Sequence, residues 1–155
     1  MRTFISALLL GFFLFVMPTL LPATLPTPLS SLAAAEVVVI VNQQGPLQSI
    51  TPREVSDLYL GRTRNFASGE VALVLEQPRD SAIRQAFFGA VNGMPIRQVN
   101  AYWARLQFSG EVQPPITLNN SQEVKARVSQ HRNAIGYIDA SLVDNSVKVV
   151  QRLNK

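Results

Sequence analysis

The feature that most limits how this chain can fold is the run of five apolar residues VVVIV at positions 37–41. β-branched side chains favour extended structure. An unbroken apolar run of this length indicates a strand that is buried on both faces, as in the centre of a layered α/β sheet. The sequence around this run is therefore expected to supply both further strands and the helices that cover them.

The clearest helix start in the sequence follows Thr51. Thr51 is placed as the N-cap, Pro52 occupies the first helical position, and Glu54 is placed to complete a capping box. Gly61 is expected to end this helix in the left-handed conformation. Three further helices are expected: one capped by Asp80 or Ser81, one opening at Pro95, and one capped by Asn120.

Further strands are expected at 71–75, 134–138 and 147–150. Strands that alternate with helices along a chain indicate a layered α/β domain. Nothing after residue 36 shows a repeat or a low-complexity run, so a single domain is expected at 36–155.

The N-terminus has the pattern of a secretory signal. Arg2 precedes an apolar run at 4–17, and three alanines at 33–35 provide a small-residue cleavage site before Glu36. These are the elements of a signal peptide, so residues 1–35 are expected to be removed and the domain to work outside the cytoplasm. The alternative is an uncleaved membrane anchor, but four prolines between positions 18 and 28 disfavour a continuous helix there.

Composition excludes several classes of function. Without Arg2, the chain has 13 basic and 10 acidic residues. The basic residues are scattered along the chain, so no nucleic-acid partner is expected. The absence of cysteine removes disulfides, thiolate nucleophiles and cysteine metal sites. The single histidine, His131, has no apparent catalytic partner, and no Gly-rich nucleotide loop is present. We therefore expect a protein that is not an enzyme and that has no cofactor or metal.

Three phrases resemble the phosphate-binding proteins of bacterial ABC uptake systems. ITPREVSDLYLGRTRNF at 50–66 resembles a stretch in which a short helix ends in a Leu-Gly turn before an aromatic residue. EQPRDSAIRQAFF at 76–88 is similar to the segment whose Arg, Asp and Ser precede a helix and contact phosphate. NAIGYIDA at 133–140 resembles the family's Gly-Ala-Ile-Gly-Tyr strand.

The resemblance implies the type 2 periplasmic binding-protein fold, with a mixed sheet flanked by helices in three layers. Family members usually have two lobes and are much longer, so the resemblance implies a shortened relative with a single lobe. The family's Ser is followed by Gly and Thr, whereas Ser81 here is followed by Ala82 and Ile83. One hydroxyl ligand is therefore missing, and the phosphate site is expected to be incomplete or altered.

The candidate ligand site comprises Arg79, Asp80, Ser81 and Ala82. A helix N-terminus offers unpaired N–H groups and partial positive charge, which favour anions. Arg79 can hold an oxoanion through two parallel hydrogen bonds. The alternative is that Asp80 or Ser81 is only an N-cap and that Arg79 is a solvated surface charge.

Three residues are accessory candidates. Arg62 and Arg64 could add positive potential near an anion, and the alternative is that both face solvent. Tyr137 alternates with its strand neighbours, so it faces either the core or a cleft. For Trp103, core packing is the expected role.

Two functions remain. The first is a periplasmic solute-binding module that captures phosphate or a similar oxoanion, with a second copy or a membrane transporter or sensor component as the candidate partner that completes the site. The second is an interaction or structural protein that kept the lobe and lost the ligand. The missing Gly and Thr after Ser81 favour the second reading, and the three resembling phrases favour the first.

Overall fold

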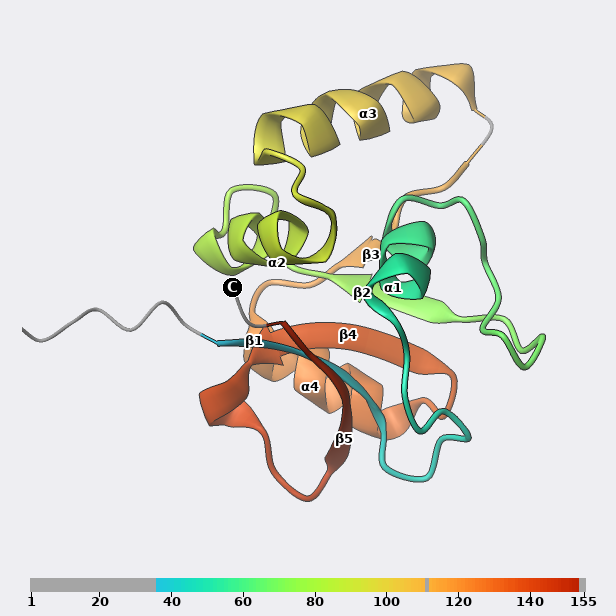
Figure 1. Cartoon of the computed structure of the whole chain (residues 1–155), viewed down its shortest axis with the longest axis vertical. Coiled ribbons are helices and arrows are strands. Elements are labelled where there is room, and N and C mark those ends of the chain that lie inside the picture. Colours follow the sequence, from blue (N-terminus) through green and yellow to red (C-terminus); the bar gives the residue numbers. More distant parts are fainter. Residues whose placement is uncertain (1–35, 111, 154–155) are drawn as a thin grey trace, which may run out of the picture. The chain divides into compact units, whose positions relative to one another are not determined.

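The computed structural model describes residues 36–110 and 112–153 (Figure 1). The expected signal region at 1–35 lies outside them. The elements in chain order are β1 (Val37–Asn42), α1 (Pro52–Tyr59), β2 (Leu73–Glu76), α2 (Ala82–Asn92), α3 (Ile96–Ser109), β3 (Ile116–Thr117), α4 (Ser121–Gln130), β4 (Ala134–Asp139), a short 3-10 helix (Ala140–Leu142) and β5 (Val147–Leu153).

The five strands form one sheet in the order β3-β2-β4-β1-β5. β1 is antiparallel to both of its neighbours, β4 and β5, whereas β2 is parallel to β3 and β4. The sheet is therefore mixed, and β1 lies inside it with a hydrogen-bonded strand on each side. This confirms the prediction drawn from the VVVIV run.

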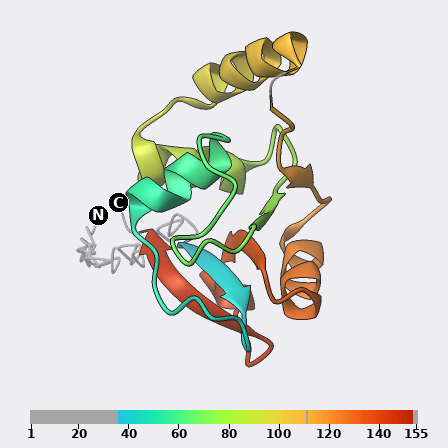
Figure 2. The same cartoon turned by 90° about the vertical axis from the view of Figure 1, so that its right-hand side faces the viewer.

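Helices cover both faces of the sheet. Val37, Val39 and Val41 pack in the core on the side of α1 and α2, and Val38 and Ile40 pack in the core on the side of α4. Figure 2 shows α4 on the opposite side of the sheet from α1 and α2. α3 lies beyond α2, farther from the sheet (Figure 1). The predicted α/β fold with helices on both faces is confirmed.

The close packing of α4 on the sheet depends on a glycine. A Cβ at Gly136, in β4, would lie 2.5 Å from Val124 Cγ1 and 3.2 Å from Val128 Cγ2. Both valines belong to α4 and are fully buried. Only a residue without a side chain lets the helix approach this strand so closely.

The predicted helix starts are accurate. Thr51 and Glu54 form the capping box, with Thr51 N donating to Glu54 Oε2 at 2.8 Å. Gly61 has a φ of 67°, as expected of a left-handed cap. Of the two candidates for the α2 cap, Ser81 is the N-cap.

Two strand predictions need correction. β2 begins at Leu73 rather than at 71, because Val71 instead forms an isolated bridge with Asn65 in the preceding loop. The short strand β3 was not among the expected strands. Its two residues follow Pro114-Pro115, and they carry no alternating pattern by which a strand could be recognised.

Candidate functional site

The N-terminus of α2 is joined to the carboxyl end of β2 by the loop at 77–81. Ser81 has extended dihedral angles, and its Oγ accepts a hydrogen bond from Arg84 N at 3.3 Å. The N–H groups of Ala82 and Ile83 donate to no acceptor among the described residues. Asp80 and Ala82 are exposed, and Ser81 is half-buried. The helix therefore begins with two amides that are free to bind a ligand.

Arg79 lies on the loop just before this turn and lines a hollow of about 120 Å³. Gln77, Arg84 and Asn100 line the same hollow, whereas Asp80, Ser81 and Ala82 do not. Arg79 is therefore next to the first turn of α2 in the chain, but the hollow that it lines is not lined by the other three candidate residues. An oxoanion bound at the first turn of α2 would lie outside this hollow.

A buried ion pair that the sequence analysis did not identify forms one wall of this hollow. Arg84 Nε lies 2.8 Å from Glu76 Oε1, and both side chains are almost fully buried. An η-nitrogen of the same guanidinium donates to Asn100 Oδ1 at 2.7 Å and to Arg79 O at 3.3 Å. Arg84 also lies over the ring of Phe88, with the guanidinium carbon 5.2 Å from the ring centroid.

This pair changes the electrostatics of the site. Burial raises the pKa of Glu76, and the charge of Arg84 opposes that rise. Because the positive charge of Arg84 is matched inside the protein, it adds little free potential for an external anion. Arg79 is then the one cation of this hollow for which the other described residues that line it supply no free negative charge. The signal that could have revealed the pair is the charged residue at the end of an apolar strand, because a charge there needs a partner.

Tyr137 faces the core. Its ring is fully buried and stacks on Phe87, with centroids 3.8 Å apart and an angle of 8° between the planes. Its hydroxyl accepts from Gln77 N at 3.4 Å, and Gln77 Nε2 donates to Tyr137 O at 3.0 Å. Burial raises the pKa of Tyr137. Tyr137 therefore supports the loop after β2 from beneath rather than lining its surface.

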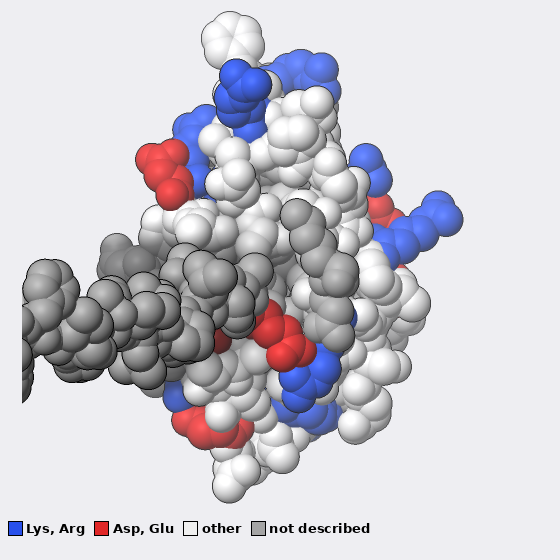
Figure 3. Space-filling model, turned by 60° about the vertical axis from the view of Figure 1, so that its left-hand side comes forward, with Lys and Arg blue, Asp and Glu red and all other residues white. Residues whose placement is uncertain are grey.

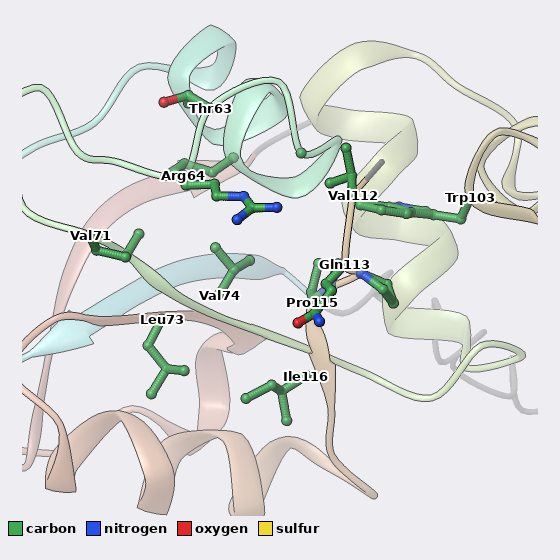
Figure 4. A pocket seen from close by; sticks show the side chains of 14 residues that line it. Thr63, Arg64, Val71, Leu73, Val74, Trp103, Val112, Gln113, Pro115 and Ile116 are labelled. Carbon is green, nitrogen blue, oxygen red and sulfur yellow. The ribbon is translucent and has the colours of Figure 1, made fainter. Parts of the chain in front are cut away.

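The other two accessory candidates lie on the loop after α1. Arg62 is exposed and pairs with Asp57 at 3.1 Å. Arg64 lines a different groove from Arg79, together with Trp103 (Figure 4). Neither arginine lines the hollow beside Arg79. Trp103 is buried and packs in the core on the α1 and α2 side, as expected.

Basic residues form no single continuous patch on the face drawn in Figure 3, where they lie in small groups with acidic residues near some of them. Within residues 36–110 and 112–153, no three His, Asp or Glu side chains are grouped so that they could hold a metal ion. No helix in the part of the chain that the structure describes is long and apolar enough to cross a membrane.

No model of a known protein family matches the chain, and no curated protein sequence matches it. Several solved structures do match the chain. A protein from Clostridium perfringens, described as a phosphate ABC transporter substrate-binding protein with bound phosphate, aligns over 75% of this chain with a TM-score of 0.60 and 23% identity. An ABC-type phosphate transport receptor from Vibrio cholerae aligns over 75% with a TM-score of 0.59 and 20% identity. PstS from Borrelia burgdorferi aligns over 75% with a TM-score of 0.56 and 13% identity.

The likeness confirms the resemblance at the level of the fold. The chain has the α/β architecture of these periplasmic binding proteins, with a mixed sheet and flanking helices. It spans 44% to 46% of the length of the three solved structures. The structures it resembles are named as transport and binding proteins rather than as enzymes.

Proposed function

We propose that this chain is an exported, periplasmic solute-binding module that captures phosphate or a similar oxoanion at the N-terminus of α2, without any chemical step. The observation that carries the proposal is the pair of free amides of Ala82 and Ile83 in the first turn. Such amides, together with the helix dipole, favour an anion. The likeness to proteins named for phosphate transport supports the same ligand class.

Each polar group at this turn has a defined role in binding the anion. The amides of Ala82 and Ile83 replace water around two oxygens of the anion. Ser81 Oγ already accepts a hydrogen bond from Arg84 N, but its own proton stays available for donation. Arg79 turns from its hollow to bind the anion through its guanidinium. Asp80 accepts a hydrogen bond from a protonated phosphate oxygen, which sulfate lacks at neutral pH.

The site is open, because no second lobe within the described residues covers the first turn of α2. An open site exposes the anion to water, so binding is expected to be weak unless another surface closes over it. A second copy of this chain, or a component of a membrane transporter or sensor, would supply that surface.

Calorimetric titration with inorganic phosphate tests the proposal. We expect saturable heat with the unmodified protein. Arg79→Ala is expected to weaken the phosphate affinity by about tenfold, the loss typical of a hydrogen bond to a charged group. Ser81→Ala removes one donor and the helix cap together, so its fold is checked by circular dichroism. Arg97→Ala removes an exposed arginine from the first turn of α3 and should leave binding unchanged.

Asp80→Asn provides a test of ligand choice. Because the amide can donate to sulfate as well as accept from phosphate, this variant is expected to lose the preference for phosphate over sulfate. Equal phosphate and sulfate affinity in the unmodified protein would contradict the part given to Asp80.

The competing function is an interaction protein that has lost its ligand. The observation that favours it is that polar groups at the start of α2 already have partners inside the protein: Arg84 pairs with Glu76, and Ser81 caps its own helix. Such a protein would show no heat across millimolar phosphate while remaining folded. That result would decide against oxoanion capture.

A further inference from the structure

A groove of about 200 Å³ lies between the loop after α1, the strands β2 and β3, and α3. We call it the Trp103 groove. The residues that matter for its chemistry are Arg64, Val71, Val74, Trp103, Gln113 and Ile116. Figure 4 shows their side chains gathered around one space, and none of the four residues of the candidate oxoanion site is among those that line it.

The walls of the Trp103 groove are apolar and accessible. Val71 is 60% exposed and Ile116 is 52% exposed. Among the described residues, only three large apolar side chains are exposed to this degree, and these are two of them. Val74 is half-buried between them. Exposed apolar side chains that gather in a depression mark a surface suited to an apolar group of a ligand.

The polar groups of the groove favour a negative charge. The guanidinium of Arg64 points into the space (Figure 4). No Asp or Glu of the described residues lines the groove, so none of them matches this charge. Trp103 is 5% exposed, and its Nε1–H is buried without an acceptor among the described residues. An unpaired buried donor is uncommon and needs an explanation, which an incoming acceptor would provide.

We propose that the Trp103 groove binds a small monocarboxylate with a branched aliphatic or single-ring body. The carboxylate pairs with Arg64, whose planar fork matches it, and the body packs between Val71 and Ile116. A cavity of about 150 Å³ holds benzene, so the groove is large enough for a body of this size. One guanidinium among apolar walls suits a singly charged carboxylate better than doubly charged, strongly hydrated phosphate.

The indole reports on the site directly. Trp103 is the only tryptophan in the chain, so the protein has one indole N–H signal and one tryptophan emission. The N–H is buried without an acceptor among the described residues, and a bound carboxylate or carbonyl oxygen that reached it would supply one. Binding is therefore expected to move the indole N–H resonance downfield as well as change the emission.

The experiment titrates the full chain with 4-methylpentanoate and follows the indole ¹H–¹⁵N signal of Trp103. We expect a saturable downfield shift, with 4-methylpentanamide binding about tenfold more weakly because it lacks the charge. Arg64→Gln should weaken the carboxylate about tenfold and leave the neutral amide unchanged. Arg53→Gln removes an exposed arginine from α1, outside the groove, and should change neither affinity.

Four results would overturn this assignment. One is the absence of a saturable shift with a folded protein, established by its dispersed amide spectrum. Another is an equal loss of carboxylate and amide affinity in Arg64→Gln. The third is a shift of the same signal by inorganic phosphate with similar affinity. The fourth is a peptide ending in leucine that binds more tightly than the free acid. Val71→Ser, expected to weaken acid and amide alike by severalfold, tests the apolar wall on its own.

Discussion

Replacing Arg84 with methionine is expected to destabilise the fold severely. Methionine keeps the apolar part of the side chain against Phe88 but removes the guanidinium from Glu76 and Asn100. Glu76 then has a buried carboxylate, 4% exposed, without its counter-charge. Breaking a buried ion pair by removing one partner costs about 3–5 kcal/mol, which is a large fraction of a typical domain's free energy of unfolding.

The loss is expected to depend on pH. Burial already raises the pKa of Glu76, and the charge of Arg84 limits that rise. Without Arg84 the pKa rises further. A carboxyl whose folded pKa lies above its unfolded value imposes no penalty below the unfolded pKa, and the penalty grows as pH increases through the folded pKa. The difference between the variant and the unmodified protein should therefore be largest near neutrality and shrink toward pH 4.

The assay is urea unfolding followed by circular dichroism at several pH values. Glu76→Gln combined with Arg84→Met should recover much of the lost free energy of unfolding, because neither charge is then left unpaired. Arg97→Met, at an exposed position, serves as the matched control and should cost little. A cost below about 1 kcal/mol for Arg84→Met, or a cost that does not change with pH, would refute the reasoning about this pair.

Three further predictions concern a glycine contact, a helix cap and a buried hydroxyl, and urea unfolding tests each of them. Gly136→Ala should cost about 1–3 kcal/mol, because the new Cβ would lie 2.5 Å from Val124 Cγ1. Its control is Gly89→Ala, in open space on α2, which should stabilise the fold by about 0.5–1 kcal/mol. Similar effects at both positions would contradict the close approach of α4. Thr51→Ala breaks the capping box and should cost about 1 kcal/mol; no measurable loss would mean that water caps α1 equally well. Tyr59→Phe removes a buried hydroxyl that donates to a carbonyl of β2 at 2.9 Å and should cost about 1 kcal/mol; a neutral result would mean that the carbonyl finds another donor.

The parts of the fold that could be predicted are those that local chemistry determines. The capping box at Thr51 and Glu54 and the left-handed Gly61 depend on residues only a few positions apart, and both appear as expected. The buried strand β1 follows from its unbroken apolar run. β3 could not be predicted, because its two residues are held by pairing with β2, a contact made far away in the sequence.

The candidate site was harder to foresee than the fold. The sequence limits the cap of α2 to Asp80 or Ser81, and only the structure identifies Ser81. The hollow beside Arg79 could not be foreseen, because residues of α3 and of the segment after it form part of its lining. The sequence left two orientations of Tyr137 open, toward the core or toward a cleft. Its stacking on Phe87, which the sequence does not show, places it in the core. The Glu76–Arg84 pair joins the end of a strand to a helix. Glu76 by itself indicates that a counter-charge is needed, but it does not indicate which residue supplies it.

The position of β1 between β4 and β5 has a consequence for how the domain assembles. The first strand of the domain has no neighbour in the sheet until β4 has been made and no second neighbour until β5 has been made, since Val37 pairs with Asp139 on one side and Leu153 on the other. Contacts between distant parts of a chain slow folding. An emerging chain therefore keeps its most apolar strand unpaired until synthesis is almost complete, so this strand is the segment most exposed to aggregation during that interval.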